Sequence, residues 1–184
     1  MTIKKEIEKK INDRTACVGV VGLGYVGLPL AIEFALKGFR TIGFEVDSKK
    51  TETLNRGTSH IVDVPSENVA KAIAQDLFSA TTDFAQCSAC DVIIICVPTP
   101  LRKTKDPDMS YILAAGSEIK KHMRKGQLVI LESTTYPGTT DEILLPMLEE
   151  HGQKIDEDFL LAFSPERVDP GRSEEHTSEL QSRV

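Results

Sequence analysis

The sequence lacks an excess of positive charge, and it lacks any long hydrophobic run. Its formal net charge is -6 at pH 7, so it has no general attraction to nucleic acid or to an anionic membrane surface. No apolar run approaches the roughly 18–20 residues of a membrane-spanning helix. The opening "MTIKKEIEKKIND" is charged throughout and has no apolar centre of a signal peptide. We therefore expect a cytoplasmic protein that binds neither nucleic acid nor membrane.

Cysteine is also scarce, with four residues in the chain. Cys17 and Cys96 lie within apolar runs, where cysteine usually packs as a small buried hydrophobe. Cys87 and Cys90 form a C-x-x-C pair, which could be redox-active or half of a zinc site. No second pair and no histidine at ligand spacing follows it, so we expect a chance match and no metal.

What the sequence does contain is a regular alternation of apolar strands and amphipathic helices. The chain has 184 residues, 40% of them hydrophobic, which favours one globular domain with a sizeable core. Six segments read as strands: "ACVGVVGLG", "RTIGFEVD", "LFSATTD", "DVIIICVPTP", "QLVILES" and "DFLLAFSPE". Strands that alternate with helices predict an α/β fold of the Rossmann type, a doubly wound and mainly parallel sheet with helices on both faces.

Several helix boundaries can be predicted as well. Isoleucines at positions 3, 7 and 11 predict a short amphipathic helix over residues 1–13, lying against the main body. Ser48 and Ser66 are suitable N-caps for the helices that follow them. The segment "GTTDEILLPMLEEHG" predicts one helix, capped by Thr139 or Thr140.

A glycine-rich motif follows the first strand. In "VGVVGLGYVG", Gly22, Gly24 and Gly27 form G-x-G-x-x-G. The first glycine permits the tight turn, the second lets the backbone approach a pyrophosphate, and the third allows close packing of helix on strand. The motif follows a buried strand and opens a helix, whose N-terminus favours an anion, so it predicts a dinucleotide site. The alternative is a tight turn without a ligand.

Glu45 ends the second strand, about 20 residues after the glycines, where an acidic side chain binds the ribose hydroxyls of NAD. A carboxylate there repels a 2′-phosphate, which favours NAD over NADP. Lys49 and Lys50 lie close enough to weaken this preference. The alternative is that Glu45 is only a solvated strand end.

Three further strand ends carry polar residues, and ligands of doubly wound sheets bind at this edge. "CVPTPLRK" places Thr99 between two prolines, "ESTTYPGTT" supplies Ser133 and Thr134, and "SPERVDPG" supplies Glu166 and Arg167. The alternative is ordinary capping and turn chemistry for the hydroxyls, and a surface ion pair for Glu166 with Arg167.

Together, "GVVGLGYVGLPLA", "CVPTPL", "ESTTYPGTT" and "SPERVDPG" resemble, in order and spacing, the UDP-glucose/GDP-mannose dehydrogenase family. The resemblance runs from about Ala16 to Gly171. Within the family, the last two motifs resemble the UDP-N-acetylglucosamine 6-dehydrogenases of bacterial polysaccharide pathways. These enzymes oxidise the 6-hydroxymethyl group of a UDP-sugar to a carboxylate in two hydride transfers to NAD, through a covalent cysteine intermediate.

The resemblance implies roles for individual residues. Glu166 would assist water or position the substrate, and Arg167 would lie near the sugar nucleotide. The full-length enzymes are homo-oligomers. The residues implied to bind NAD are Gly22, Gly24, Tyr25, Val26, Gly27, Glu45, Lys50, Val97, Pro98, Thr99, Ser133 and Thr134.

The nucleophilic cysteine of the family lies in a "GGxCFPKD"-type segment that this sequence does not contain. We therefore expect residues 14–171 to be the NAD-binding part of a larger enzyme, inactive alone. Residues 172–184 include "RSEEHTSELQS", which reads as an in-frame translation of a common sequencing adapter; a natural disordered terminus is the alternative. A non-catalytic NAD-binding regulatory module remains the alternative function. A single-domain reductase of another family lacks support, because no Tyr-x-x-x-Lys pair follows a strand.

Overall fold

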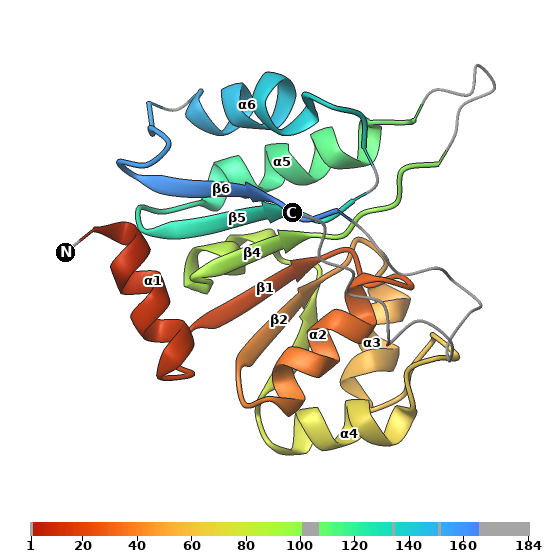
Figure 1. The fold of residues 1–184 in the computed structure, drawn as a ribbon. Helices are drawn as coiled ribbons and strands as arrows, with labels where there is room; N and C mark the ends of the chain where they lie inside the picture. Colours follow the sequence, from red (N-terminus) through yellow and green to blue (C-terminus); the bar gives the residue numbers. More distant parts are fainter. Residues whose placement is uncertain (1, 101–106, 134, 151, 166–184) are drawn as a thin grey trace, which may run out of the picture.

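The chain folds around one parallel sheet. The computed structural model describes residues 2–100, 107–133, 135–150 and 152–165. Within these ranges, six strands pair in the order β3-β2-β1-β4-β5-β6, and every pairing is parallel (Figure 1). The strands are β1 (Cys17–Val21), β2 (Arg40–Phe44), β3 (Phe78–Thr81), β4 (Val92–Ile95), β5 (Gln127–Leu131) and β6 (Phe159–Phe163). The prediction of a Rossmann-type α/β fold is confirmed.

The central strands are apolar along their whole length because helices cover both faces of the sheet. All residues of β1 and β4 are buried. Successive side chains of a strand point to opposite faces, so Val18 and Val20 enter one core while Cys17 and Val21 enter the other. Such continuous apolar runs are typical of parallel strands.

The helices divide between the two faces, as Figure 1 shows. One core is covered by α1 (Ile3–Asn12), α2 (Gly27–Leu36), α3 (Ser48–Asn55) and α4 (Ser66–Ala74). The other is covered by the 3-10 helix η1 (Phe84–Ala89), α5 (Ser110–His122), the π-helix η2 (Thr139–Leu144) and α6 (Leu145–Glu149). Among the described residues, no helix has both the length and the apolar character required to cross a membrane.

The N-terminal helix α1 lies against the body of the protein, as its pattern predicts. Ile7 is buried in the core that α1 to α4 cover, hereafter the first core, and Ile3 packs at its margin. Ile11, in contrast, is 41% exposed, so the third isoleucine of the pattern does not join the core. The last turn of α1 is held instead by an ion pair of Lys10 with Asp91.

The predicted N-caps are wrong in each case. Asp47, not Ser48, caps α3 by accepting a hydrogen bond from Lys49 N–H over 2.9 Å. Ser66 is the first residue of α4, and its hydroxyl accepts from Ser59 N–H instead. The hydroxyl of Thr139 donates to the Tyr136 carbonyl, which holds the turn before η2 rather than the helix end.

The helix predicted over residues 138–152 is divided into η2 and α6. Pro146 is the second residue of α6. Proline has no N–H to donate, and its ring crowds the carbonyl four residues earlier, so it interrupts the α-helical ladder. The turn before it is a π-helix, in which each hydrogen bond spans five residues instead of four.

Candidate functional site

A cleft of about 770 Å³ opens at the carboxyl edge of the sheet. It lies where the chain leaves β1, β2 and β4, and the strand order places β1 between β2 and β4. This is the point at which successive connections run to opposite faces, the usual ligand site of a doubly wound sheet. Predicted cofactor-binding residues line it: Gly22, Gly24, Tyr25, Val26, Glu45, Lys50, Val97, Pro98, Thr99 and Ser133.

Gly22 and Gly27 serve the purposes that the motif predicts for them, the tight turn and the close packing of helix on strand. Gly22 has a φ of +92°, a conformation that side chains rarely adopt, and it turns the chain from β1 into the loop. A Cβ at Gly27 would lie 1.8 Å from the Gly22 carbonyl oxygen, so the start of α2 packs directly on the loop. Gly27 itself does not line the cleft, and its role is this close packing.

Gly24 has open space where the other two glycines are enclosed. A Cβ built on it meets no atom within 4 Å, although the residue lines the cleft. The helix that follows, α2, has no acidic residue in its first turn to compete for the free N–H groups there. The loop therefore fits the pyrophosphate of a dinucleotide, whose close approach requires a bare backbone beside a helix N-terminus.

Glu45 lies on the wall of this cleft, at the end of β2, and is only 8% exposed. Its Oε2 accepts a hydrogen bond from Leu23 N–H over 3.4 Å, which links the acid to the glycine-rich loop. Its Oε1 accepts from Val46 N–H over 2.9 Å. The carboxylate is thus held in place at the cleft wall, at the strand end where the sequence predicts a ribose-binding acid.

The ends of β4 and β5 contribute Thr99 and Ser133. Ser133 is buried, and its hydroxyl lies 2.9 Å from the Val97 carbonyl, to which it donates. The hydroxyl therefore joins the two strand ends as well as lining the cleft. Thr134, Glu166, Arg167 and residues 172–184 lie outside the described residues.

The sequence did not predict the residues that line the far wall of the cleft. Tyr111, Ala115 and Glu118 of α5 line it, together with Phe84 of η1. The ring of Phe84 lies 5.5 Å from that of Phe44, centroid to centroid. No motif marks these positions. The spacing of Tyr111, Ala115 and Glu118 places them on one helix face, but only the packing of α5 on the sheet shows that this face reaches the cleft.

His60 is a further cleft residue that the sequence did not indicate. It follows α3 in an irregular segment and lines the cleft beside the glycine-rich loop. Its Nε2 lies 2.8 Å from the Leu23 carbonyl oxygen. A single histidine in a polar loop carries no signal of such a contact.

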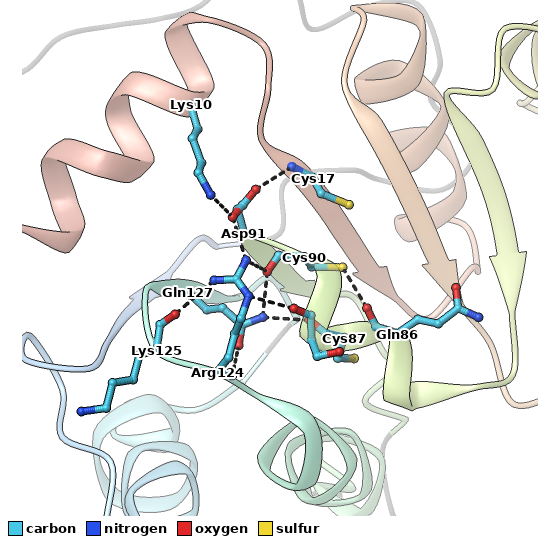
Figure 2. Close-up of polar contacts among 10 residues, drawn as sticks. Lys10, Cys17, Gln86, Cys87, Cys90, Asp91, Arg124, Lys125 and Gln127 are labelled. Carbon is cyan, nitrogen blue, oxygen red and sulfur yellow. Dashed lines mark hydrogen bonds and ion pairs between the residues drawn. The ribbon is translucent and has the colours of Figure 1, made fainter.

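A polar network centred on Asp91 lies at the opposite edge of the sheet, away from the cleft. Asp91, at the start of β4, is 5% exposed and accepts hydrogen bonds from Lys10, Arg124 and Cys17 N–H at 2.6, 2.8 and 3.0 Å (Figure 2). Burial raises the pKa of Asp91, but these three donors outweigh it and hold the pKa below its ordinary value. Gln127 extends the network by donating to the carbonyls of Cys87 and Cys90. Its place, among α1, η1 and three strand starts, indicates a structural role.

The cysteines belong to the interior. All four are free and buried. Burial raises the pKa of Cys87 to about 12, with the carboxylates of Asp83 and Glu118 acting in the same direction. The Cys90 thiol donates a hydrogen bond to the Gln86 carbonyl oxygen over 3.8 Å. Its side-chain interaction with Cys17 raises the pKa of Cys90 and lowers that of Cys17. In the described ranges, no group of three or more His, Cys, Asp or Glu side chains is arranged to hold a metal ion.

Comparison with known proteins shows the family of this chain. Residues 16–183 match the UDP-glucose/GDP-mannose dehydrogenase family, NAD binding domain. The chain is 40% identical over 166 residues to the UDP-N-acetyl-D-glucosamine 6-dehydrogenase of Pseudomonas aeruginosa, a match that covers 89% of this chain and 38% of the relative. It is 37% identical over 156 residues to the UDP-N-acetyl-D-mannosamine dehydrogenase of Pyrococcus horikoshii, covering 84% of this chain and 37% of the relative.

Solved structures agree with these sequence relatives. The GDP-mannose dehydrogenase of Pseudomonas aeruginosa, in a ternary complex, superposes with a TM-score of 0.79 at 33% identity, covering 83% of this chain and 36% of that chain. The chain thus spans little more than a third of the length of the relatives it matches. It belongs to the UDP-glucose/GDP-mannose dehydrogenase family and corresponds to the NAD-binding domain of that family.

Proposed function

We propose that the chain is the NAD-binding part of a UDP-sugar 6-dehydrogenase that oxidises UDP-N-acetylglucosamine or a related nucleotide sugar. The observation that carries the proposal is the meeting of three features in one cleft: the open glycine-rich loop at Gly24, the held carboxylate of Glu45, and the strand-end residues Thr99 and Ser133. The sugar itself is suggested by relatives that act on UDP-N-acetylglucosamine and UDP-N-acetylmannosamine.

Bound NAD would accept hydride from the sugar C6 carbon. The residues of this chain would bind and orient it: the loop from Gly22 to Gly27 at the pyrophosphate, Glu45 and Lys50 at the adenosine ribose. Val97, Pro98, Thr99, Ser133 and Thr134 would lie along the nicotinamide half. A substrate held beyond these strand ends would then present C6 to the cofactor.

Glu166 and Arg167 would complete the site on the sugar side. In the sequence they come shortly after β6, the strand that pairs with β5, and Ser133 comes shortly after β5. We assign to Glu166 the assistance of water or the positioning of substrate, and to Arg167 a place near the sugar nucleotide. Support comes from the "SPER" motif and the parallel strand order.

We also place the enzyme in the cytoplasm, in a polysaccharide pathway. The four free, buried thiols support a reducing compartment. The pathway and a homo-oligomeric full-length enzyme rest on the family resemblance.

A chimera tests the proposed reaction. Residues 16–171 replace the matching segment of the Pseudomonas aeruginosa UDP-N-acetyl-D-glucosamine 6-dehydrogenase, and NADH formation is followed with UDP-N-acetylglucosamine. We expect sugar-dependent NADH, which Gly24→Val should abolish. A chimera that melts cooperatively and binds NAD, yet oxidises none of UDP-N-acetylglucosamine, UDP-N-acetylmannosamine and UDP-glucose, would contradict the proposal.

A further inference from the structure

The segment between α3 and α4 is held rigidly beside the glycine-rich loop. Ser59 N–H donates to the Ser66 hydroxyl over 2.9 Å, and the Ser59 hydroxyl bonds to both the N–H and the carbonyl of Ile61. The side chains of Ile61 and Val64 are buried in the first core. His60 is therefore presented to the cleft from a fixed backbone, flanked by two anchored residues.

His60 contacts the middle residue of the G-L-G turn. Its Nε2 lies 2.8 Å from the Leu23 carbonyl oxygen. A carbonyl oxygen can only accept, so Nε2 carries the proton and donates. Nδ1 is buried and meets no partner among the described residues, so a proton there would be left unsatisfied. The surroundings thus favour the arrangement in which Nε2 donates to the Leu23 carbonyl oxygen.

Leu23 is fixed from three sides. His60 holds its carbonyl, and Glu45 accepts from its N–H over 3.4 Å. Its side chain is fully buried against β2, where a Cβ at Gly43 would come within 2.7 Å of it. The chain between Gly22 and Gly24 consequently has little freedom to rotate its peptide planes.

The orientation of one peptide plane matters for an anion. The Leu23 carbonyl and the Gly24 N–H belong to the same trans peptide unit, and in a trans unit these two groups point in opposite directions. By binding the carbonyl, His60 directs the Gly24 N–H away from the α3–α4 segment. Gly24 is also the glycine with open space beside it in the cleft.

We propose that His60 is a positioning residue for the cofactor: it sets the Leu23–Gly24 peptide plane so that the glycine-rich loop is ready to donate to the pyrophosphate. This inference rests on the proposed function of the cleft as an NAD site. A positioning role differs from a purely structural role in its effect on binding. Loss of His60 should lower the affinity for ligands that carry the pyrophosphate and leave the affinity for ligands without it unchanged.

The test compares NAD, ADP-ribose and adenosine in calorimetric titrations of the wild-type chain, His60→Phe, His60→Gln and His60→Asn. Phenylalanine has no hydrogen-bond donor, and the amide of asparagine is too short to reach the Leu23 carbonyl. His60→Phe and His60→Asn should therefore bind NAD and ADP-ribose roughly 5–20-fold more weakly and bind adenosine as the wild type does. His60→Gln, whose amide can reach the carbonyl, should recover most of the affinity. His122→Phe, on α5, is the matched control and should bind like the wild type.

The outcomes distinguish a failure of the His60 role from a failure of the NAD site itself. His60 does not position the loop if its variants bind NAD as tightly as the wild type. The same conclusion follows if the variants lose as much affinity for adenosine as for NAD. If the folded wild type does not bind NAD, the proposed function fails first. Should His60→Phe not fold, the comparison of His60→Gln with His60→Asn decides the question.

Discussion

Lys50 Nζ lies 3.5 Å from Oε2 of Glu45, so the acid expected to bind the adenosine ribose is paired with a lysine at the cleft wall. Glu45 is buried, whereas the Lys50 side chain is 42% exposed. The two charges act in opposite directions on a 2′-phosphate: the carboxylate repels it and the ammonium attracts it. The choice between NAD and NADP therefore depends on which charge is nearer to the ribose.

We expect Glu45→Gln to weaken NAD binding by roughly 10-fold, because a charge-assisted hydrogen bond to the ribose is replaced by a neutral one. The same change should reduce the preference for NAD over NADP, since Lys50 then acts unopposed. Titration with both cofactors measures the two effects. Glu52→Gln, in an exposed ion pair on the same helix as Lys50, is the control and should bind both cofactors like the wild type. Unchanged NAD affinity in Glu45→Gln would remove Glu45 from the site.

The three glycines should separate folding from binding. Gly27→Ala places a Cβ 1.8 Å from the Gly22 carbonyl, so the loop must move and we expect a lower melting temperature together with loss of NAD binding. Gly24→Ala meets no atom of the protein within 4 Å, so it should melt like the wild type and yet bind NAD at least about 10-fold more weakly. Thermal melts and NAD titrations of both variants provide the check. If Gly24→Ala bound NAD normally, the pyrophosphate would not approach the loop there.

Asp91 should make stability depend on pH. Its folded pKa is depressed, so its contribution is present above the ordinary value of about 3.9 and is lost as the pH falls through the folded pKa. We expect Asp91→Asn to lower the free energy of unfolding by about 2 kcal/mol at pH 7, below the usual cost of breaking a buried pair because Lys10 and Arg124 can turn toward solvent.

Urea denaturation of both proteins between pH 7 and pH 2 measures this. The difference in unfolding free energy between the wild type and Asp91→Asn should shrink toward acid. Glu52→Gln should lower the free energy of unfolding by less than about 0.5 kcal/mol, because exposed ion pairs contribute little to stability. A difference that stays constant with pH would show that the charge of Asp91 is not what stabilises the network.

The cysteines should be inert in the folded protein. With its pKa raised to about 12, the thiolate fraction of Cys87 near neutral pH is roughly a thousand-fold below that of a free cysteine. The other three thiols are shielded by burial. We expect iodoacetamide at pH 8 to modify none of the four in the native protein and all four in urea, as counted by mass spectrometry. Rapid native labelling of Cys87 or Cys90 would reopen a redox role for the C-x-x-C pair.

The sequence predicted the sheet and the glycine-rich end of the cleft because both depend on local patterns. Continuous apolar strands and the G-x-G-x-x-G turn are short-range features, and the acid at Glu45 follows from the length of one strand–helix–strand unit. The N-caps failed because several suitable residues compete at each helix start, and Asp47 rather than Ser48 met the free N–H.

The remaining walls of the cleft depend on contacts between distant segments. His60 reaches Leu23, and Phe84 reaches Phe44, only after α3, α4 and η1 have packed on the sheet. Nothing in the local spacing around either residue indicates its partner. The helix predicted over residues 138–152 lies between these two cases. Pro146 can be read from the sequence, but the π-helix that precedes it cannot.

Binding of NAD in the cleft is the central claim, and one calorimetric titration of the folded chain with NAD tests it. We predict one saturable site with a dissociation constant between about 1 μM and 1 mM, the range in which enzyme KM values usually fall. NADP should bind more weakly, and Gly24→Val should not bind at all. A chain that melts cooperatively but shows no saturable binding of NAD, or a Gly24→Val variant that binds it equally well, would contradict the account.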